Sequence, residues 1–238
     1  MAFLILEAGT PVEPLRRHGG FPHWIRVAAG LAADETVAYD VTAEPPPPAE
    51  GFAGVFVTGS AAMVSHRDAW SEAAAGWLRD AADAGLPVFG ICYGHQLLAH
   101  GLGGRVDDHP EGREMGTVEV EVLPAAQGDP LFGGVPARFA AHATHMQTVL
   151  APPPGAVVLA RSAHDACQAF RWGASAWGVQ FHPEFSAAHM RGYVHARADA
   201  LRAEGRDPAA LSRNITATPH ARRLMRRFVA VARGMQAR

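Results

Sequence analysis

The sequence predicts an α/β protein with an open, mostly parallel central sheet flanked by helices, a smaller antiparallel portion and a C-terminal helical extension. In the first half of the chain, short apolar runs alternate with helical patterns, as expected for parallel strands joined by crossover helices. Residues 117–122 instead alternate apolar and polar side chains, which is typical of an antiparallel strand. We expect residues 1–186 to form one domain and residues 187–238 to form helices packed on it.

The predicted elements of the first half follow one another as strand, helix, strand. Residues 67–84 carry Trp70, Ala74, Trp77 and Leu78 at the spacing of one helical face, and Gly85 ends this helix. A proline run at residues 45–48 predicts a stiff surface connection. We expect strands at residues 3–6, 36–41, 52–57 and 88–91, and helices at residues 21–31 and 67–84.

The second half contains short apolar segments separated by Pro and Gly turns, which predict a more antiparallel half folded onto the first. Residues from 186 onward have helical patterns, with Thr218 and Pro219 as N-cap and first residue of the last helix. That helix carries Arg222, Arg223, Arg226 and Arg227, which we interpret as a solvated face or a docking surface for an acidic partner. The predicted strands are residues 117–122, 138–141, 156–161, 168–171 and 176–181.

Composition and charge narrow the possible functions. The chain is 48% hydrophobic with a net charge of −2, so we expect neither nucleic acid nor a membrane as a partner. No basic leader and no apolar run of about 20 residues occurs, which indicates a cytoplasmic protein. All 21 basic residues are Arg, which excludes Schiff-base lysines and the P-loop lysine. We expect no cofactor and no metal, because His142 and His145 have no Cys or carboxylate at ligand spacing.

A candidate nucleophile lies in the segment P-V-F-G-I-C-Y-G-H-Q at residues 87–96. Gly90 and Gly94 flank Cys92 in the pattern Gly-x-Cys-x-Gly, the cysteine counterpart of a strand–turn–helix nucleophile elbow. The N–H groups that begin the following helix favour the thiolate and can hold an oxyanion. We therefore interpret Cys92 as a nucleophile; the alternative is a small buried cysteine.

A candidate base lies in the segment W-G-V-Q-F-H-P-E-F at residues 177–185. The strand pattern ends at His182, because Pro183 is excluded from the interior of a sheet. Glu184 follows two residues later and is close enough to accept a hydrogen bond from one ring nitrogen while the other faces Cys92. The alternative is a histidine at a strand end beside a solvated glutamate.

Together, G-I-C-Y-G-H-Q and G-V-Q-F-H-P-E resemble the two signatures of the class I, triad-type glutamine amidotransferases. The elbow and the segment G-R-E-M-G at residues 112–116 are also similar to the amidotransferase domain of GMP synthase and its stand-alone relatives. The resemblance implies the flavodoxin-like amidotransferase fold for residues 1–186.

The resemblance also implies roles for individual residues. Cys92 would attack the side-chain amide of glutamine and form a thioester, His182 would protonate the departing ammonia and then activate water, and Glu184 would orient His182. The backbone N–H groups of Gly59 and Tyr93 would hold the oxyanion. Where many relatives have Gly-Gly-Pro, residues 58–61 read T-G-S-A, so only Gly59 is carried over.

The implied substrate-binding residues include one departure from the family pattern. Gln96 matches a position that helps to hold glutamine. The family segment Ser-His-x-Asp appears as T-H-M-Q, which assigns His145, Met146 and Gln147 to the substrate's amino-acid end. Because Gln147 lacks the charge that would pair with a substrate ammonium, the sequence leaves a γ-glutamyl peptide open as the substrate.

These observations leave three functions open. The first is a glutaminase that releases ammonia for an acceptor, with a possible separate synthetase subunit since the chain shows no ATP-binding segment. The second is a γ-glutamyl hydrolase or peptidase with the same triad. The third is a non-catalytic binding or regulatory relative. In the first two, the partner is a small-molecule substrate, glutamine or a γ-glutamyl compound.

Overall fold

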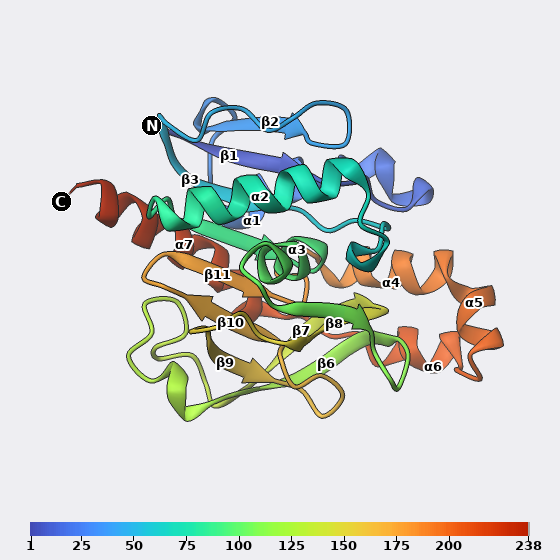
Figure 1. Ribbon diagram of the computed structural model, residues 1–238. Helices are drawn as coiled ribbons and strands as arrows, with labels where there is room; N and C mark the ends of the chain where they lie inside the picture. The colour runs from blue at the N-terminus through green and yellow to red at the C-terminus, as the bar shows by residue number, and fades with distance from the viewer. Residues whose placement is uncertain (238) are drawn as a thin grey trace.

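The computed structural model describes residues 1–237, and in them nine strands form one sheet (Figure 1). Five neighbouring strands pair in parallel and the rest pair antiparallel. The order across the sheet, parallel strands first, is β2 (Thr36–Asp40), β1 (Ala2–Glu7), β3 (Phe52–Val57), β4 (Val88–Ile91), β11 (Ala176–Val179), β10 (Ala169–Trp172), β9 (Val157–Arg161), β6 (Glu114–Val122) and β7 (Arg138–His145).

The turn pattern predicts an antiparallel half folded onto the parallel half. In the structure the antiparallel strands instead continue the same sheet. The connecting strand is β11, which pairs in parallel with β4 on one edge and antiparallel with β10 on the other. All four residues of β11 are buried, as expected for a strand that pairs on both edges inside the core. Five strands appear close to their predicted positions in this half, and the predicted helices from residue 186 onward are present.

The predicted smaller antiparallel portion includes a separate two-stranded antiparallel sheet, whose two strands were not predicted individually. It pairs β5 (Arg105–Asp108) with β8 (Gln147–Ala151). In β5 only Val106 is buried, so the strand lacks the apolar alternation that a sequence reading needs, and its pairing with β8 defines it.

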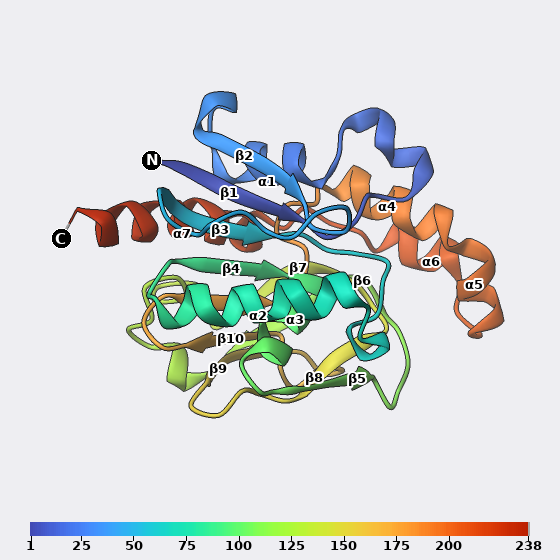
Figure 2. The same cartoon turned by 45° about the horizontal axis from the view of Figure 1, so that its top comes forward.

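Helices cover both faces of the large sheet, as the two main apolar clusters show. One face packs on α1 (Phe21–Ala29) and α7 (Pro219–Gln236), with Phe228 of α7 lying 4.9 Å from Phe56 of β3 between ring centres. The other face packs on α2 (Ala69–Asp83) and α3 (Tyr93–Gly101), through residues such as Leu78 and Leu97. Figures 1 and 2 show α2 and α3 on the near side of the sheet and α7 on the far side.

Three short helices extend from one end of the sheet, at the right of Figure 1. They are α4 (Ala187–Ala196), α5 (Ala198–Ala203) and α6 (Pro208–Arg213), and a third apolar cluster joins them to α1 through Phe185, Met190 and Tyr193. Short 3₁₀ helices are η1 (Glu13–His18), η2 (Ala33–Glu35), η3 (Val64–His66) and η4 (Pro124–Ala126). Within residues 1–237, no helix has the length and apolar character needed to cross a bilayer.

The arginines of α7 divide into two kinds. Arg227 donates to the carbonyl oxygens of Leu131 and Gly133, at 2.6 Å each, and Arg222 donates to the carbonyl of Glu184 at 3.3 Å. Arg223 and Arg226 are exposed. The helix therefore uses half of this cluster to fix itself to neighbouring loops, and only the other half forms a solvated face.

The parallel register brings three strand ends to one edge of the sheet. Val57 of β3 pairs with Gly90 of β4, and Ile91 of β4 pairs with Val179 of β11. The residues that directly follow these strands therefore lie side by side, as expected at the carboxyl ends of parallel strands. Gly59, Cys92 and His182 are among them.

Candidate active site

Cys92 lies on a strained turn between β4 and α3, as the Gly-x-Cys-x-Gly pattern predicts. Its φ is 53° and its ψ is −101°, a backbone conformation that non-glycine residues rarely adopt. The glycines on either side are required by close packing. A Cβ on Gly90 would lie 2.4 Å from the carbonyl oxygen of Gly94, and one on Gly94 would lie 2.6 Å from that of Val57.

His182 and Glu184 form a buried pair immediately after β11. The Nδ1 atom of His182 donates to Oε1 of Glu184 at 2.8 Å, and both side chains are almost fully buried. The backbone N–H of His182 donates to the carbonyl of His142 at 2.7 Å, which fixes the end of the strand. Glu184 is buried, which excludes the alternative that it is a solvated glutamate. The Nε2 atom of His182 is left for Cys92.

The electrostatics of the site favour a thiolate beside an imidazolium. Burial acts to raise the pKa of Cys92, but the charge of His182 and a hydrogen bond to it outweigh burial and leave that pKa below its usual value. Burial acts to lower the pKa of His182, whereas the charges of Glu184 and Cys92 raise it to about 10. Both shifts stabilise the nucleophilic form of the sulfur together with a proton on His182.

The predicted oxyanion donors lie next to the sulfur. A Cβ on Gly59 would lie 3.0 Å from Cε1 of His182 and 3.9 Å from Cβ of Cys92, so only glycine fits here without displacing the histidine. Tyr93 is the first residue of α3, where a backbone N–H has no partner within the helix. Its hydroxyl forms a hydrogen bond with Ser71 at 2.6 Å.

A cavity of about 70 Å³ beside Cys92 brings together the predicted substrate-binding residues Gln96, His145, Met146 and Gln147. Gln96 donates through Nε2 to the backbone carbonyl of Gln147 at 2.6 Å and to Oε1 of Gln180 at 2.9 Å. The sequence did not single out Arg113 and Arg197, which also line this cavity.

The side chain of Gln147 is held by the protein. Its Nε2 donates to Oγ of Ser65 at 2.6 Å and to Oδ1 of Asp108 at 3.0 Å, and its Oε1 accepts from the N–H of Ser65 at 3.3 Å. Asp108 belongs to the unpredicted strand β5. Both polar ends of the Gln147 amide are therefore engaged by η3 and β5.

His145 forms a second buried pair that the sequence reading missed. Its Nδ1 donates to the carbonyl of Gln147 at 2.9 Å and its Nε2 donates to Oε2 of Glu114 at 2.9 Å. Burial opposes both charges, yet the contact raises the pKa of His145 and lowers that of Glu114. Glu114 lies within G-R-E-M-G, so this segment carries a structural partner of the substrate cavity.

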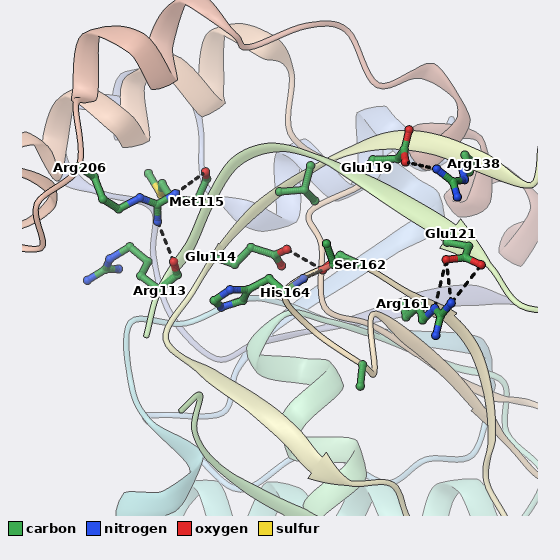
Figure 3. A pocket seen from close by; sticks show the side chains of 13 residues that line it. Arg113, Glu114, Met115, Glu119, Glu121, Arg138, Arg161, Ser162, His164 and Arg206 are labelled. Atoms are coloured by element: carbon green, nitrogen blue, oxygen red, sulfur yellow. Dashed lines mark hydrogen bonds and ion pairs between the residues drawn. The ribbon is translucent and has the colours of Figure 1, made fainter. Parts of the chain in front are cut away.

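A groove of about 670 Å³, drawn in Figure 3, lies on the other side of Glu114. Its charged side chains mostly pair with one another, as in Arg138 with Glu119 at 3.0 Å and Arg161 with Glu121 at 3.1 Å. Figure 3 also shows Ser162 donating to Glu114, at 2.7 Å. Cys92 does not line this groove, so we place the candidate site in the smaller cavity. Within residues 1–237, no group of three or more potential ligands is arranged to hold a metal.

Comparison with protein families and curated proteins gave consistent matches. A family model described as "Glutamine amidotransferase class-I" matches residues 31–197. The chain is 44% identical to a glutamine-hydrolyzing GMP synthase of Thermomicrobium roseum over 131 residues, which are 55% of this chain and 23% of that protein. It is 40% identical to the A subunit of the glutamine-hydrolyzing GMP synthase of Pyrococcus abyssi over 100 residues, 42% of this chain and 51% of that one. The chain thus spans about a quarter to a half of these relatives.

Solved structures share the fold over nearly the whole chain. A glutamine amidotransferase from Thermotoga maritima has a TM-score of 0.74 at 22% identity and covers 97% of both chains. A glutamine amidotransferase from Methylobacillus flagellatus has a TM-score of 0.76 at 24% identity, with 99% of this chain and 94% of that chain covered. These neighbours confirm the predicted α/β fold.

Proposed function

The chain belongs to the class-I glutamine amidotransferase family, and we propose that it hydrolyses a γ-glutamyl amide through a thioester on Cys92, with glutamine as the reference substrate. The membership confirms the family resemblance carried by the two motifs. The observation that supports the reaction is the buried hydrogen bond between Glu184 and His182, on the same cavity as Cys92, where the charges favour a thiolate and an imidazolium.

In the first half of the reaction, the thiolate of Cys92 attacks the amide carbon and a C–S bond forms. The carbonyl oxygen becomes negative and accepts hydrogen bonds from the N–H groups of Gly59 and Tyr93. His182 then gives its Nε2 proton to the leaving nitrogen, the C–N bond breaks, and ammonia departs. The raised pKa of His182 keeps this proton available at neutral pH.

In the second half, His182 is neutral and takes a proton from water. The resulting hydroxide attacks the thioester, the C–S bond breaks, and glutamate leaves with Cys92 again a thiolate. Throughout, Glu184 accepts the Nδ1–H of His182, which keeps Nε2 directed at the reacting atoms.

The direct test measures glutamate and ammonia release from glutamine by the purified protein. We expect Cys92→Ala to lower kcat by about 10⁴-fold or more. The matched control is Cys167→Ala, because Cys167 is the other buried cysteine and burial raises the pKa of its thiol. A glutamine-like electrophile should modify Cys92 alone. Absence of both turnover and modification would contradict the proposal and favour a non-catalytic relative.

The recipient of the ammonia is proposed to be a separate synthetase subunit. The Pyrococcus abyssi relative supports this, since its name describes it as one subunit of a glutamine-hydrolyzing GMP synthase. We expect added synthetase subunit to raise the rate of glutamine hydrolysis. An unchanged rate, with no complex detected by gel filtration, would contradict this pairing.

A further inference from the structure

A second cavity, of about 240 Å³, borders Cys92 on the side of His182. The two cavities adjoin, because five residues line both of them: Ser60, Ala61, Cys92, Thr144 and Arg197. His182 lines only the larger cavity and Gln96 lines only the smaller. A buried water needs roughly 10–15 Å³. The space next to His182 is therefore far larger than departing ammonia requires.

The positions of His182 and Gln96 determine which part of a substrate lies on each side. In the proposed reaction His182 protonates the leaving nitrogen, so the leaving group must lie in the cavity that His182 lines. The γ-glutamyl group then lies toward Gln96. The larger cavity is thus placed to hold whatever is attached to the amide nitrogen, a group that glutamine lacks.

The lining of the larger cavity indicates what that group is. Arg16 and Arg197 line it, and no Asp or Glu does. Within residues 1–237 neither arginine pairs with a carboxylate, and the buried Nε of Arg197 has no hydrogen-bond partner. Arg16 donates through Nε to the carbonyl of Pro11 at 3.0 Å, which directs the guanidinium without neutralising it.

The remaining walls are largely apolar. Pro11, Val12, Phe21 and Tyr193 are among the residues that line it. The guanidinium of Arg197 also lies over the ring of Tyr193, with its Cζ 5.9 Å from the ring centre. Two guanidinium groups without a carboxylate partner, beside an apolar wall, suit a carboxylate on a small organic group, because an arginine fork binds carboxylates through charge-assisted hydrogen bonds.

We propose that this cavity is a leaving-group subsite for an amine that carries a carboxylate, so that γ-glutamyl amino acids and peptides are preferred over their neutral counterparts. The inference rests on the proposed function and keeps its chemistry. The bond from Cys92 Sγ to the γ-carbon forms, the bond from that carbon to the amino acid nitrogen breaks, and His182 supplies the proton to the nitrogen. Water then releases glutamate and regenerates the thiolate.

The test compares γ-glutamylglycine with γ-glutamylglycinamide, which differ only in carboxylate against amide. Glutamate release gives kcat/KM for each. We expect the acid to be preferred about tenfold or more, as for a charged hydrogen bond. Arg16→Gln and Arg197→Gln should each reduce this preference at least about threefold. Arg17→Gln is the matched control, because Arg17 is adjacent to Arg16 and equally classed as exposed but does not line the cavity.

Each outcome separates this inference from the proposed function. Equal kcat/KM for acid and amide, or a preference that survives both substitutions, overturns the subsite. Cys92-dependent hydrolysis of glutamine with no cleavage of either dipeptide also overturns the subsite but leaves the proposed function standing. No glutamate from any substrate, together with an unmodified Cys92, contradicts the proposed function and this inference with it.

Discussion

Replacing Glu184 with glutamine should move the alkaline limit of activity. Glu184→Gln keeps an oxygen that accepts from Nδ1 of His182 but removes the charge that lies 2.8 Å away. Unit charges about 4 Å apart in a protein-like medium attract by ~4 kcal/mol, which corresponds to about 3 pKa units. With burial still opposing the imidazolium, the pKa of His182 should fall from about 10 into the range of roughly 7–8.

The assay is the pH dependence of kcat/KM for glutamine hydrolysis. His182 must carry a proton to donate it, so activity is lost as pH rises through its pKa; it is lost at low pH as Cys92 becomes protonated. In Glu184→Gln the alkaline limb should move down by about 2–3 units, with activity near pH 9 reduced roughly thirtyfold. The control is Glu50→Gln, an exposed position. An alkaline limb that stays in place would refute the assignment of Glu184 as the charged partner of His182.

Three further predictions concern stability, each measured by urea denaturation. Gly90→Ala should lower the free energy of unfolding by at least ~2 kcal/mol, because the added Cβ would lie 2.4 Å from a backbone oxygen. The control is Gly76→Ala in α2, where the Cβ has open space and the change should be neutral or stabilising by up to ~1 kcal/mol. Equal effects of the two substitutions would contradict this prediction. Glu114→Gln removes the carboxylate that lies 2.9 Å from the buried His145 and leaves only the more distant Asp165, at 4.0 Å, so it should lower the free energy of unfolding by up to about 3–5 kcal/mol. The loss of stability should be greatest between pH 4.5 and 6.5, the ordinary pKa values of a glutamate and a histidine. It should become smaller as pH rises through the raised pKa of His145, and also as pH falls through the lowered pKa of Glu114. A loss of stability that does not depend on pH would show that the pair is uncharged. Arg227→Lys should lower the free energy of unfolding by about 1–2 kcal/mol, because lysine cannot donate to both loop carbonyls as the guanidinium does. An unchanged urea midpoint would show that this contact does not stabilise the protein.

The structural features of the candidate site that can be predicted from the sequence are those encoded locally. The elbow needs only a strand, two glycines around Cys92 and a helix, and all of these lie within residues 88–101. The pair of His182 and Glu184 depends on a two-residue spacing after a strand that Pro183 ends. Short-range steric rules are sufficient for both.

The parts that the sequence does not reveal depend on contacts between distant residues. Glu114 and His145 are 31 residues apart and face each other because β6 and β7 pair in that register. Arg16 and Arg197 meet at one cavity from opposite ends of the chain. No periodicity records these contacts, because each residue is ordinary in its own segment.

The sheet shows the same division. Strands with continuous apolar runs, such as β3 at Phe52–Val57, are found where the pattern places them. The position of β11 between β4 and β10 determines that the two halves share one sheet, and this follows from tertiary packing. The strand β5 has a single buried residue, Val106, and so gives no signal before its partner is known.

The most direct test of the account is to trap the acyl-enzyme. The protein is mixed with glutamine, quenched in acid within the turnover time, digested and analysed by mass spectrometry. We predict a γ-glutamyl thioester on the peptide that contains Cys92 and none on the peptide that contains Cys167. Glutamate formation with no adduct on Cys92, at a rate that Cys92→Ala leaves unchanged, would contradict catalysis through a thioester on Cys92.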